Sequence, residues 1–559
     1  MSNRRAIIEA SLVVVLGVAA FGSTLALVQR SNDYAFFDPI ISVKSAVSAT
    51  YAEEISAETV RKMQEGAITG MLEALDDPYT VYVPPADTAE FNKDLTGEYV
   101  GIGAQVNITE GYLTIVSPLE DSPAYRAGLM AEDKVVEIEG QSTLGLSIDE
   151  CVRRLMGQPG TPVSILVERG GQRLPVTIVR ERINTRAVKG IVRDPANPNE
   201  WRFLIDPERK IAYLRITQFL PRSSAEVAKA LASVGADRGG LNGLILDVRS
   251  NPGGVLQDAV AIADFFLKDG VIVSTRGRAF PERIERASEP GTLPDFPIVV
   301  LINGQSASAS EILAGALVEN DRAVAVGTRT FGKGSVQTVR NIRVSEGGVE
   351  KTAELKITEQ AYYLPSGRNL TRKGASLQWG VDPSPGHFVP LTDAQTLDML
   401  RARRDEDVLR APGQGANPGA EPMGLDLVKK LKDPQLEAAY AAVLARVTTG
   451  QWPPVDAGAT PAMTQAAAEE LSRLFATRDR LTRDMIRIER RAEELERALG
   501  DAATKPKDLW PDEVDVVGGK VQVFDKDGRL ISTLEITGNS LERWLIDAEV
   551  KPYQDASPK

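Results

Sequence analysis

The stretch "PIVVLINGQSASASEILAGALVEN", residues 297–320, joins a short apolar run to a series of small residues and then to a helical pattern. The run from Pro297 to Asn303 predicts a buried strand, and a helix is expected to begin at about Ser308. A strand that turns directly into a helix is the repeating unit of α/β folds. The turn also suits chemistry, because small side chains let a substrate backbone approach and a helix N-terminus offers free N–H groups.

The same alternation extends on both sides of this stretch, over residues 200–390. Strands are predicted at "KIAYLRI", "GLILDVRS" and "RAVAVGT", and helices at "SSAEVAKALASVGA" and "GVLQDAVAIADFFL". This order predicts an α/β layer with a largely parallel sheet. Gly253 and Gly254 lie in a second strand-to-helix turn, which adjacent parallel strands would bring to the same carboxyl edge of the sheet. Taken alone, the two glycines could form only a tight turn.

Two other kinds of pattern precede this layer. Residues 35–95 are helical in spacing and then rich in turns. From Thr96 to Arg182, short runs of alternating polarity are separated by glycine turns, with one helical stretch at "SIDECVRRLM". That pattern predicts a small β domain with about two helices.

The chain after about residue 395 is polar and helical, with a Gly/Pro/Ala-rich linker at "APGQGANPGAEP". Apolar residues recur at three-and-four spacing between Leu471 and Leu499. Such heptads favour either a homo-oligomer or packing on the body of the protein. The tail "GKVQVFDKDGRLISTLEI" predicts a β-hairpin about Lys526–Gly528.

The composition is that of an ordinary globular protein. The 559 residues are 43% apolar and 25% charged, with a formal net charge of −12, so nucleic-acid binding over the whole chain is not expected. The single cysteine, Cys151, excludes an internal disulfide, a zinc ribbon and a thiol redox pair.

The N-terminus has the order of an export signal. Arg4 and Arg5 precede an apolar stretch from Ala10 to Val28. A basic and then apolar order directs the chain across a membrane, and the small residues near Ala26 suit signal-peptidase cleavage. An uncleaved stretch of this length could also anchor the protein in a bilayer. A buried core helix is the remaining alternative.

The three serines at positions 306, 308 and 310 are candidate nucleophiles, and each would need a base to accept its proton. The only histidine, His387, lies in a Pro/Gly-rich loop beyond the βα alternation, and Cys151 lies on the expected helix of the β domain. Neither position favours a Ser-His-Asp triad or a Cys-His pair. Lysine is the remaining base, and its pKa of roughly 10.4 would have to fall by about 3 through burial.

Lys333, in "VGTRTFGKGSVQTV", is the lysine that fits this requirement. It adjoins Phe331 and two glycines, and acidic residues lie more than ten positions away in sequence. Lys351 and Lys356 have glutamates nearby and are expected to be exposed strand residues.

Both segments also have simpler interpretations. Ser310 could merely cap a helix, since Ser/Ala-rich helix starts are common. Gly327 to Lys333 matches most of a phosphate-binding loop, which would make the site one for nucleotides. Against that, residue 334 is Gly rather than Ser or Thr, and the following "SVQTVRNIRV" alternates like a strand where a phosphate loop opens into a helix.

Taken together, these segments resemble the carboxyl-terminal processing proteases, also called tail-specific proteases. The resemblance rests on "GQSASASEILAGALVENDRAVAVGTRTFGKGSVQ" together with "LDDPYTVYVPP", "LTGEYVGIGAQV", "SPAYRAGLMAEDKVVEIEG", "LDVRSNPGGVL" and "AYYLPSGRNL", and it covers roughly residues 35–385. It implies an exported serine peptidase with a Ser-Lys dyad and an inserted PDZ domain. The mechanism of such an enzyme requires no metal or cofactor.

The family's functional residues can be carried over position by position. The resemblance implies Ser308 as nucleophile, Lys333 as general base and Gln337 as the residue that positions the lysine. Lys333 and Gln337 are four residues apart and on a strand would share a face, so this pairing is physically reasonable. Oxyanion donors would be the backbone N–H of Ala309 and of the Gly253–Gly254 turn. A peptide's terminal carboxylate would bind at the PDZ loop formed by Tyr99, Val100, Gly101, Ile102 and Gly103.

Two features depart from the family pattern. At the end of the PDZ helix, where the family usually has a basic residue before Gly, this chain has Met156–Gly157. The coupling between the PDZ domain and proteolysis is therefore expected to differ. The region beyond about residue 400 matches nothing in the core family, so a catalytically silent peptide-binding scaffold is retained as the alternative function.

The expected fold is α/β (α+β multidomain): a mixed βα-sandwich protease core with an inserted β-rich PDZ domain. The predicted segments are 1–30 (signal peptide or membrane anchor), 31–95 (N-terminal helices), 96–182 (PDZ domain), 183–395 (serine protease core, with part of 70–95), 396–460 (helical linker region), 461–500 (heptad helix) and 501–559 (C-terminal β-hairpin extension).

The expected partners follow from this organisation. They are proteins or peptides with free apolar C-termini, a further copy of the chain in a homo-oligomer, an adaptor protein, and a membrane if the N-terminal segment is not cleaved; nucleic acid is not among them. The expected location is the bacterial periplasm or cell envelope, with residues 10–28 as an anchor to the inner membrane if they are retained.

Overall fold

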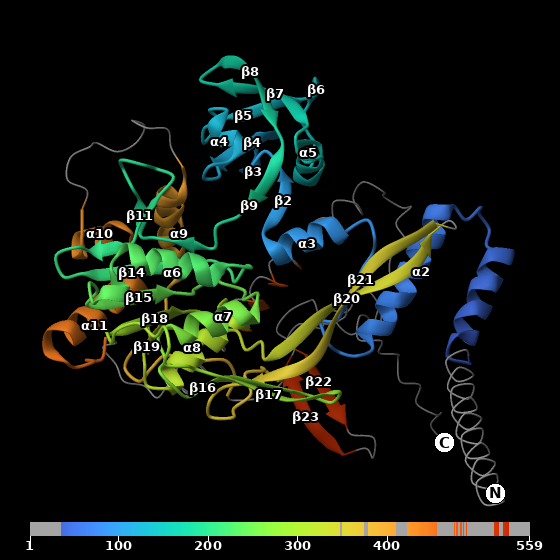
Figure 1. Cartoon of the computed structure of the whole chain (residues 1–559). Helices are drawn as coiled ribbons and strands as arrows, with labels where there is room; N and C mark the ends of the chain where they lie inside the picture. Colours follow the sequence, from blue (N-terminus) through green and yellow to red (C-terminus); the bar gives the residue numbers. More distant parts are fainter. Residues whose placement is uncertain are drawn as a thin grey trace, which may run out of the picture. The chain divides into compact units, whose positions relative to one another are not determined.

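A computed structural model describes most of the chain as two compact units, Met1–Ala467 and Ala468–Lys559 (Figure 1). The described residues are 35–346, 349–373, 378–409 and 422–455 in the first unit, and 474–475, 477–478, 481–482, 485, 488, 519–524 and 529–535 in the second. The apolar stretch at 10–28 and much of the predicted heptad helix lie outside these ranges. Each unit is described by itself.

The centre of the first unit is the predicted parallel sheet. Its four parallel strands follow one another in the order β14 (Ile211–Ile216), β15 (Gly243–Asp247), β18 (Ile298–Ile302) and β19 (Val324–Gly327). Short strands β10 (Val188–Lys189) and β13 (Leu204–Asp206) pair antiparallel with β14. Beside them lie a small ladder, β11 (Val192–Arg193) with β12 (Trp201–Arg202), and a short 3₁₀ turn, Ala236–Arg238. The prediction of an α/β layer with a largely parallel sheet is confirmed.

Successive residues of a strand point to opposite sides of the sheet. Both sides are apolar here, and helices cover both. On β14, Ala212 and Leu214 pack into one hydrophobic cluster, while Ile211 and Tyr213 pack into another. The first cluster is completed by α6 (Ser223–Ser233), α7 (Leu256–Asp264) and α8 (Ala309–Glu319). The second is completed by α10 (Leu425–Lys430) and α11 (Pro434–Thr449).

Residues 396–460 were predicted to be a helical linker region, and the structure gives them a different role. α11 lies so close to β15 that a Cβ at Gly243 would meet Val443 at 2.7 Å. Because α10 and α11 fill the second face of the central sheet, they belong to the core and do not merely connect it to the next segment. Their polar, Ala-rich sequence conceals an apolar stripe that includes Leu436, Ala439 and Val443.

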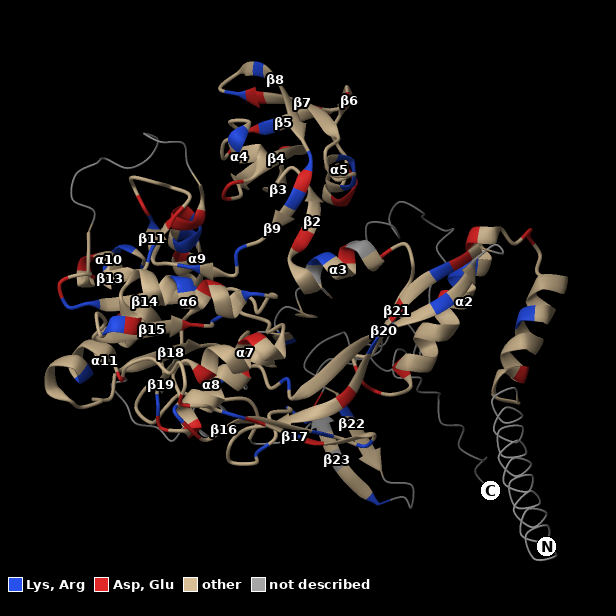
Figure 2. Ribbon diagram, in the orientation of Figure 1, with Lys and Arg blue, Asp and Glu red and all other residues tan. Residues whose placement is uncertain are grey.

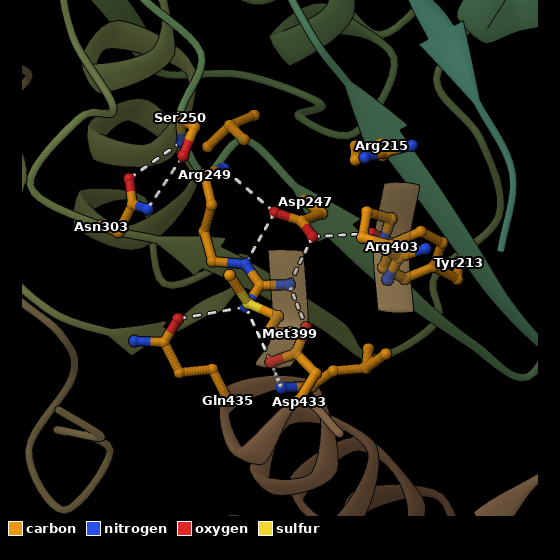
Figure 3. Close-up of polar contacts among 12 residues, drawn as sticks. Tyr213, Arg215, Asp247, Arg249, Ser250, Asn303, Met399, Arg403, Asp433 and Gln435 are labelled. Carbon is orange, nitrogen blue, oxygen red and sulfur yellow. Dashed lines mark hydrogen bonds and ion pairs between the residues drawn. The ribbon is translucent and has the colours of Figure 1, made fainter. Parts of the chain in front are cut away.

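A buried ion-pair network fixes this C-terminal region to the carboxyl end of β15 (Figure 3). The Arg249 guanidinium lies 2.7 Å from carboxylate oxygens of both Asp247 and Asp433, and it also donates to Gln435. Met399 of α9 (Asp393–Asp407) contacts the same guanidinium. Burial by itself raises the pKa of Asp247, but Arg249 outweighs it and lowers that pKa to about 2.

A second, antiparallel sheet brings the N-terminal part of the chain into the first unit. Its strand order is β1 (Val81–Val83), β21 (Val349–Tyr363), β16 (Val271–Gly277) and β17 (Phe280–Arg286), and β20 (Ser335–Glu346) also pairs with β21. Helices at 35–50, α2 (Ala57–Glu73) and α3 (Thr88–Thr96) flank β1 in sequence. The β20–β21 hairpin carries charges of both signs (Figure 2), including the cross-strand ion pair of Arg340 with Glu359.

The β domain predicted at 96–182 forms its own hydrophobic cluster around Leu113, Ile115 and Val163. Its sheet has the order β3 (Ala104–Thr109), β4 (Tyr112–Pro118), β5 (Lys134–Ile138), β7 (Pro162–Arg169) and β8 (Gln172–Val179), with β6 (Gln141–Ser142) paired to β5. It contains the helices α4 (Pro123–Arg126) and α5 (Ile148–Leu155). Strands β2 (Glu98–Gly101) and β9 (Glu181–Asn184) pair where the chain enters and leaves this domain.

The described residues of the second unit agree with two predictions. β22 (Lys520–Phe524) and β23 (Leu530–Glu535) pair antiparallel, which confirms the C-terminal hairpin. Leu474, Leu481, Met485 and Ile488 of the predicted heptad segment are helical and exposed. Within the described residues, no helix combines the length and apolarity that a bilayer span requires.

Replacing Asp433 tests whether the C-terminal region is part of the core. Asp433→Ala leaves the buried Arg249 with one carboxylate partner fewer, and removal of one member of a buried ion pair costs about 3 kcal/mol or more. We expect urea denaturation to show a loss of that size in the free energy of unfolding. Asp426→Ala, at an exposed carboxylate of α10, is the control and should stay within about 0.5 kcal/mol. Equal losses in the two variants would contradict this role.

Candidate active site

Ser308 is the N-cap residue, immediately before α8, and has a backbone conformation that a non-glycine residue rarely adopts. Its φ is 56° and its ψ is −115°, and the residue is 7% exposed. Such strain costs of order 1–3 kcal/mol and is found at functional sites, where the surrounding structure maintains it. The strand β18 and the helix α8 therefore hold Ser308 in a fixed, strained turn.

The other two serines have structural hydrogen bonds. The Ser306 hydroxyl donates to the carbonyl of Val248 at 2.8 Å, and the Ser310 hydroxyl donates to the carbonyl of Asn251 at 2.9 Å. The Ser308 hydroxyl instead lies near the buried Tyr362, whose pKa burial raises to about 12 while Ser308 acts to lower it. Among the three, Ser308 is thus the serine whose side chain is not bound to a backbone carbonyl of the neighbouring turn.

A single buried carboxylate joins the serine turn to the lysine loop. Oε2 of Glu311 accepts the backbone N–H groups of Ser308 and Lys333, both at 2.8 Å. Oε1 accepts the Gly332 N–H at 2.7 Å and the Thr330 hydroxyl at 2.6 Å. Burial raises the pKa of Glu311, while these hydrogen bonds lower it. Glu311 therefore sets the distance between the two segments that carry the predicted dyad.

Lys333 has the depressed pKa that a neutral lysine base requires. Burial is the largest cause and the charge of Lys356 adds to it, so that the pKa falls to about 8. Glu311 and Asp77 act in the opposite direction. Lys356 was predicted to be exposed, and this was wrong: pairing of β1 with β21 half-buries it near Lys333. The acidic neighbours of Lys333 come from distant parts of the chain, so sequence distance did not reveal them.

Gln337 hydrogen-bonds to two hydroxyl groups on β20 and β21. Its amide nitrogen donates to Ser335 at 2.7 Å and to Thr358 at 3.1 Å. The argument that Lys333 and Gln337 share a strand face fails, because β20 begins at Ser335 and its register shifts between Val336 and Gln337. The role of Gln337 in positioning the lysine stays a prediction.

The glycine-rich turn after β15 and the serine-rich turn after β18 are in contact, as expected for neighbouring parallel strands. Gly253, with φ of 100°, lies so close to Ser308 that a Cβ there would be 2.7 Å from Cβ of Ser308 and 3.0 Å from the nitrogen of Ala309. The Gly253 N–H itself donates to Oδ1 of Asn251 at 2.9 Å. Gly254 lies next to it, against the carbonyl of Phe219. The fold thus brings the turn of Gly253 and Gly254 to Ser308 and Ala309, as predicted for the oxyanion donors. The Gly253 N–H, however, is hydrogen-bonded within its own turn.

The predicted carboxylate loop of the β domain runs from β2 into β3. Gly103 has φ of 76°, and a Cβ there would meet Ser122 at 2.4 Å, so only glycine fits this approach to α4. The carbonyls of Ile102 and Gly103 accept N–H groups of Ala124 and Leu119. Tyr99 is on β2, with its pKa raised to about 12 by burial. These contacts fix the loop beside α4.

At the end of α5 this chain has Met156 where the family motif has a basic residue. A different basic side chain, that of Arg180 just after β8, reaches this position. Arg180 donates to the carbonyls of Arg154 and Leu155 at the end of α5, each at 3.0 Å. A Cβ at Gly157 would meet Nε of Arg180 at 2.9 Å. The end of α5 is therefore capped by a guanidinium that the sequence motif did not locate.

The alternative sites fare differently. His387 is buried, with Nδ1 hydrogen-bonded to the carbonyl of Pro385. The segment after Lys333 is strand β20, whereas a phosphate loop requires a helix there, so the structure does not support the nucleotide-binding interpretation. Glu311 and Tyr362 were not among the site residues predicted from the sequence. The available signal for Glu311 was an acidic residue in an otherwise small and apolar helix.

Comparison with known proteins identifies the family. Residues 210–383 match the model of peptidase family S41, residues 114–169 that of the PDZ domain, and residues 29–87 that of the N-terminal domain of the activating protease CtpB. The carboxy-terminal-processing protease of Bartonella bacilliformis is 34% identical over 406 residues, which are 70% of this chain and 86% of that protein. The chain belongs to peptidase family S41, among the carboxy-terminal-processing proteases.

Other relatives cover less of the molecule. A probable CtpA-like serine protease of Staphylococcus haemolyticus is 33% identical over 315 residues, 56% of this chain and 59% of that protein. Among solved structures, the photosystem II D1 C-terminal processing protease is 26% identical, with coverage of 59% of this chain and 82% of that one and a TM-score of 0.35.

Gly253→Ala tests the contact between the two turns. A Cβ in this position overlaps Ser308 and requires a backbone conformation that alanine avoids, so the turn must move away from the nucleophile. We expect kcat for a peptide substrate to fall at least about 100-fold. Gly239→Ala, where φ is also positive but no atom lies within 4 Å, is the matched control and should keep nearly full activity. Similar kcat values for both variants would argue against the contact.

Proposed function

We propose that this chain is an endopeptidase that cleaves peptide bonds through a Ser308–Lys333 dyad. The observation that carries the proposal is the pairing of a strained serine at a helix N-terminus with a lysine of pKa about 8, both held by the Glu311 carboxylate. Serine is a nucleophile only beside a base, and a lysine with this pKa is partly neutral near pH 7.

The reaction would follow two steps. Oγ of Ser308 attacks the substrate carbonyl and Nζ of Lys333 accepts its proton. The C–N bond then breaks, the lysine returns the proton to the leaving amine, and an acyl-enzyme remains. Water releases the acyl group in the second step, with the lysine again as base. The N–H groups of Ala309 and of the Gly253–Gly254 turn would stabilise the oxyanion, the Gly253 N–H after it leaves Oδ1 of Asn251.

We propose that the PDZ domain selects the substrate by its free, apolar C-terminus. The loop Tyr99–Gly103 is rigidly placed beside α4, and its glycines allow close approach of a peptide backbone. A peptide that adds as a strand next to this loop would present its carboxylate to the loop's N–H groups. Cleavage would then depend on the tail as well as on the bond that is cut.

We also propose the cellular setting that the sequence predicts. The basic and apolar N-terminus would export the protein to the bacterial periplasm or cell envelope, with residues 10–28 as an anchor if retained. The exposed heptad residues Leu474, Leu481, Met485 and Ile488 would form a homo-oligomer or receive an adaptor.

Two substitutions test the dyad. Ser308→Ala and Lys333→Ala should each reduce cleavage of a tail-bearing model protein by at least about 1,000-fold, because either change removes the nucleophile or its base. Cleavage is followed by gel and mass spectrometry. Lys351→Ala, at an exposed lysine of β21, is the control and should cleave like wild type. A wild type that cleaves no better than the dyad variants would favour the alternative, a catalytically silent PDZ scaffold.

Amidation of the tail tests selection by the PDZ domain. An amide removes the charge that the carboxylate loop would bind, so we expect the KM for the amidated protein to rise about tenfold or more. The substrate with a free C-terminus is the matched comparison, measured with the same enzyme preparation. Equal kinetics for free and amidated tails would rule out carboxylate capture at Tyr99–Gly103.

A further inference from the structure

A segment that the dyad mechanism does not use lies directly against its base. Nζ of Lys333 is 4.6 Å from the centroid of the Tyr79 ring. Tyr79 precedes β1 and is more than 250 positions from Lys333 in the chain, so its position is a product of the fold. The ring is half-buried and lies over the ammonium group.

The segment that carries Tyr79 is held by hydrogen bonds at both ends. The Asp77 carboxylate accepts the N–H of Tyr79 at 3.1 Å and the hydroxyl of Thr80 at 2.6 Å. The Thr80 hydroxyl in turn accepts the N–H of Thr358 on β21 at 3.1 Å. From Val81 onward, the chain pairs with β21, with Val81 opposite Lys356. The ring is therefore fixed in place by the same strand that brings Lys356 near the base.

We propose that Tyr79 is a positioning residue for the catalytic base: its ring covers Nζ of Lys333 and keeps water away from it. The proposal rests on the proposed function, because it assigns Tyr79 a role only if Lys333 is the base. It adds the N-terminal segment at 77–83 to the active site, where the sequence had assigned part of 70–95 to the protease core without a role for any of its residues in the chemistry.

Two effects of the ring on the lysine oppose each other. An aromatic face attracts an ammonium group and by itself favours the charged lysine. Exclusion of water disfavours the charged lysine, and burial is the largest cause of the lowered pKa of Lys333. Because burial dominates, loss of the ring should raise this pKa.

The remaining charged groups around Lys333 would stay in place if Tyr79 were replaced. Lys356 faces it from β21, Glu311 from α8 and Asp77 from the N-terminal segment. Burial, with the nearby carboxylates of Glu311 and Asp77, raises the pKa of Tyr79 itself, so its hydroxyl is uncharged at neutral pH. The interaction is consequently one of the ring, and phenylalanine should replace tyrosine without loss.

The test is the pH dependence of kcat between pH 6 and 10 for wild type, Tyr79→Phe and Tyr79→Ala. Activity requires the neutral lysine, so it should rise with pH through the pKa of Lys333, near 8 in wild type. Tyr79→Phe should keep this rise at the wild-type pH. Tyr79→Ala should move it upward by about one unit and lose about tenfold in kcat at pH 7, while the plateau at high pH is largely kept.

Tyr82→Ala is the matched control for loosening of the segment. Tyr82 lies on β1 opposite Leu355, on the other face of the strand from Val81, and its replacement should leave the rise at the wild-type pH. If Tyr79→Ala does not fold, Tyr79→Leu is measured instead and should move the rise in the same direction by a smaller amount.

The outcomes separate this inference from the function on which it rests. An unmoved rise with a lowered plateau in Tyr79→Ala, or a rise moved to lower pH, would overturn the role of the ring while Lys333→Ala remained inactive. Full activity of Lys333→Ala would overturn the dyad itself. An upward shift in Tyr79→Ala together with inactive Lys333→Ala supports both.

Discussion

The carboxylate of Glu311 is the interaction on which the rest of the site depends. It accepts N–H groups from the turn before α8 and from the loop that carries Lys333, two segments that follow the paired strands β18 and β19. Ser308 keeps an unfavourable backbone conformation, and a buried acceptor for its N–H helps to maintain it. The carboxylate thus links Ser308, the proposed nucleophile, to the loop of Lys333, the proposed base.

This link creates an electrostatic conflict that the surrounding fold resolves. A buried carboxylate near a lysine stabilises the ammonium form, and so does Asp77. Burial and the charge of Lys356, which lies on β21 opposite Val81 of β1, outweigh both. The pKa of the base is thus set by elements from three distant parts of the sequence, and the site is complete only when all three are folded together.

The sequence predicted those features that local pattern determines. The alternation of strands and helices predicted the parallel sheet. The position of the single histidine in a loop beyond this alternation favoured Lys333 as the base. Contacts between distant segments could not be predicted from the sequence. These are the Tyr79 ring over Lys333, Lys356 near Lys333, and Arg180 at the end of α5. The face-sharing argument for Gln337 failed for a local reason, since a strand start and a register shift lie between it and Lys333.

The packing of α11 also shows that the core of the protease includes residues beyond the family motif. Side chains on one face of the central sheet, among them Tyr213, Val299 and Leu301, pack against α10 and α11. Val455 still bonds back to Gly386 beyond α11. A chain shortened at the family motif near residue 385 would keep every proposed catalytic residue and expose this apolar face to water. Its expected fate is aggregation, so a soluble form of the protease must retain α10 and α11.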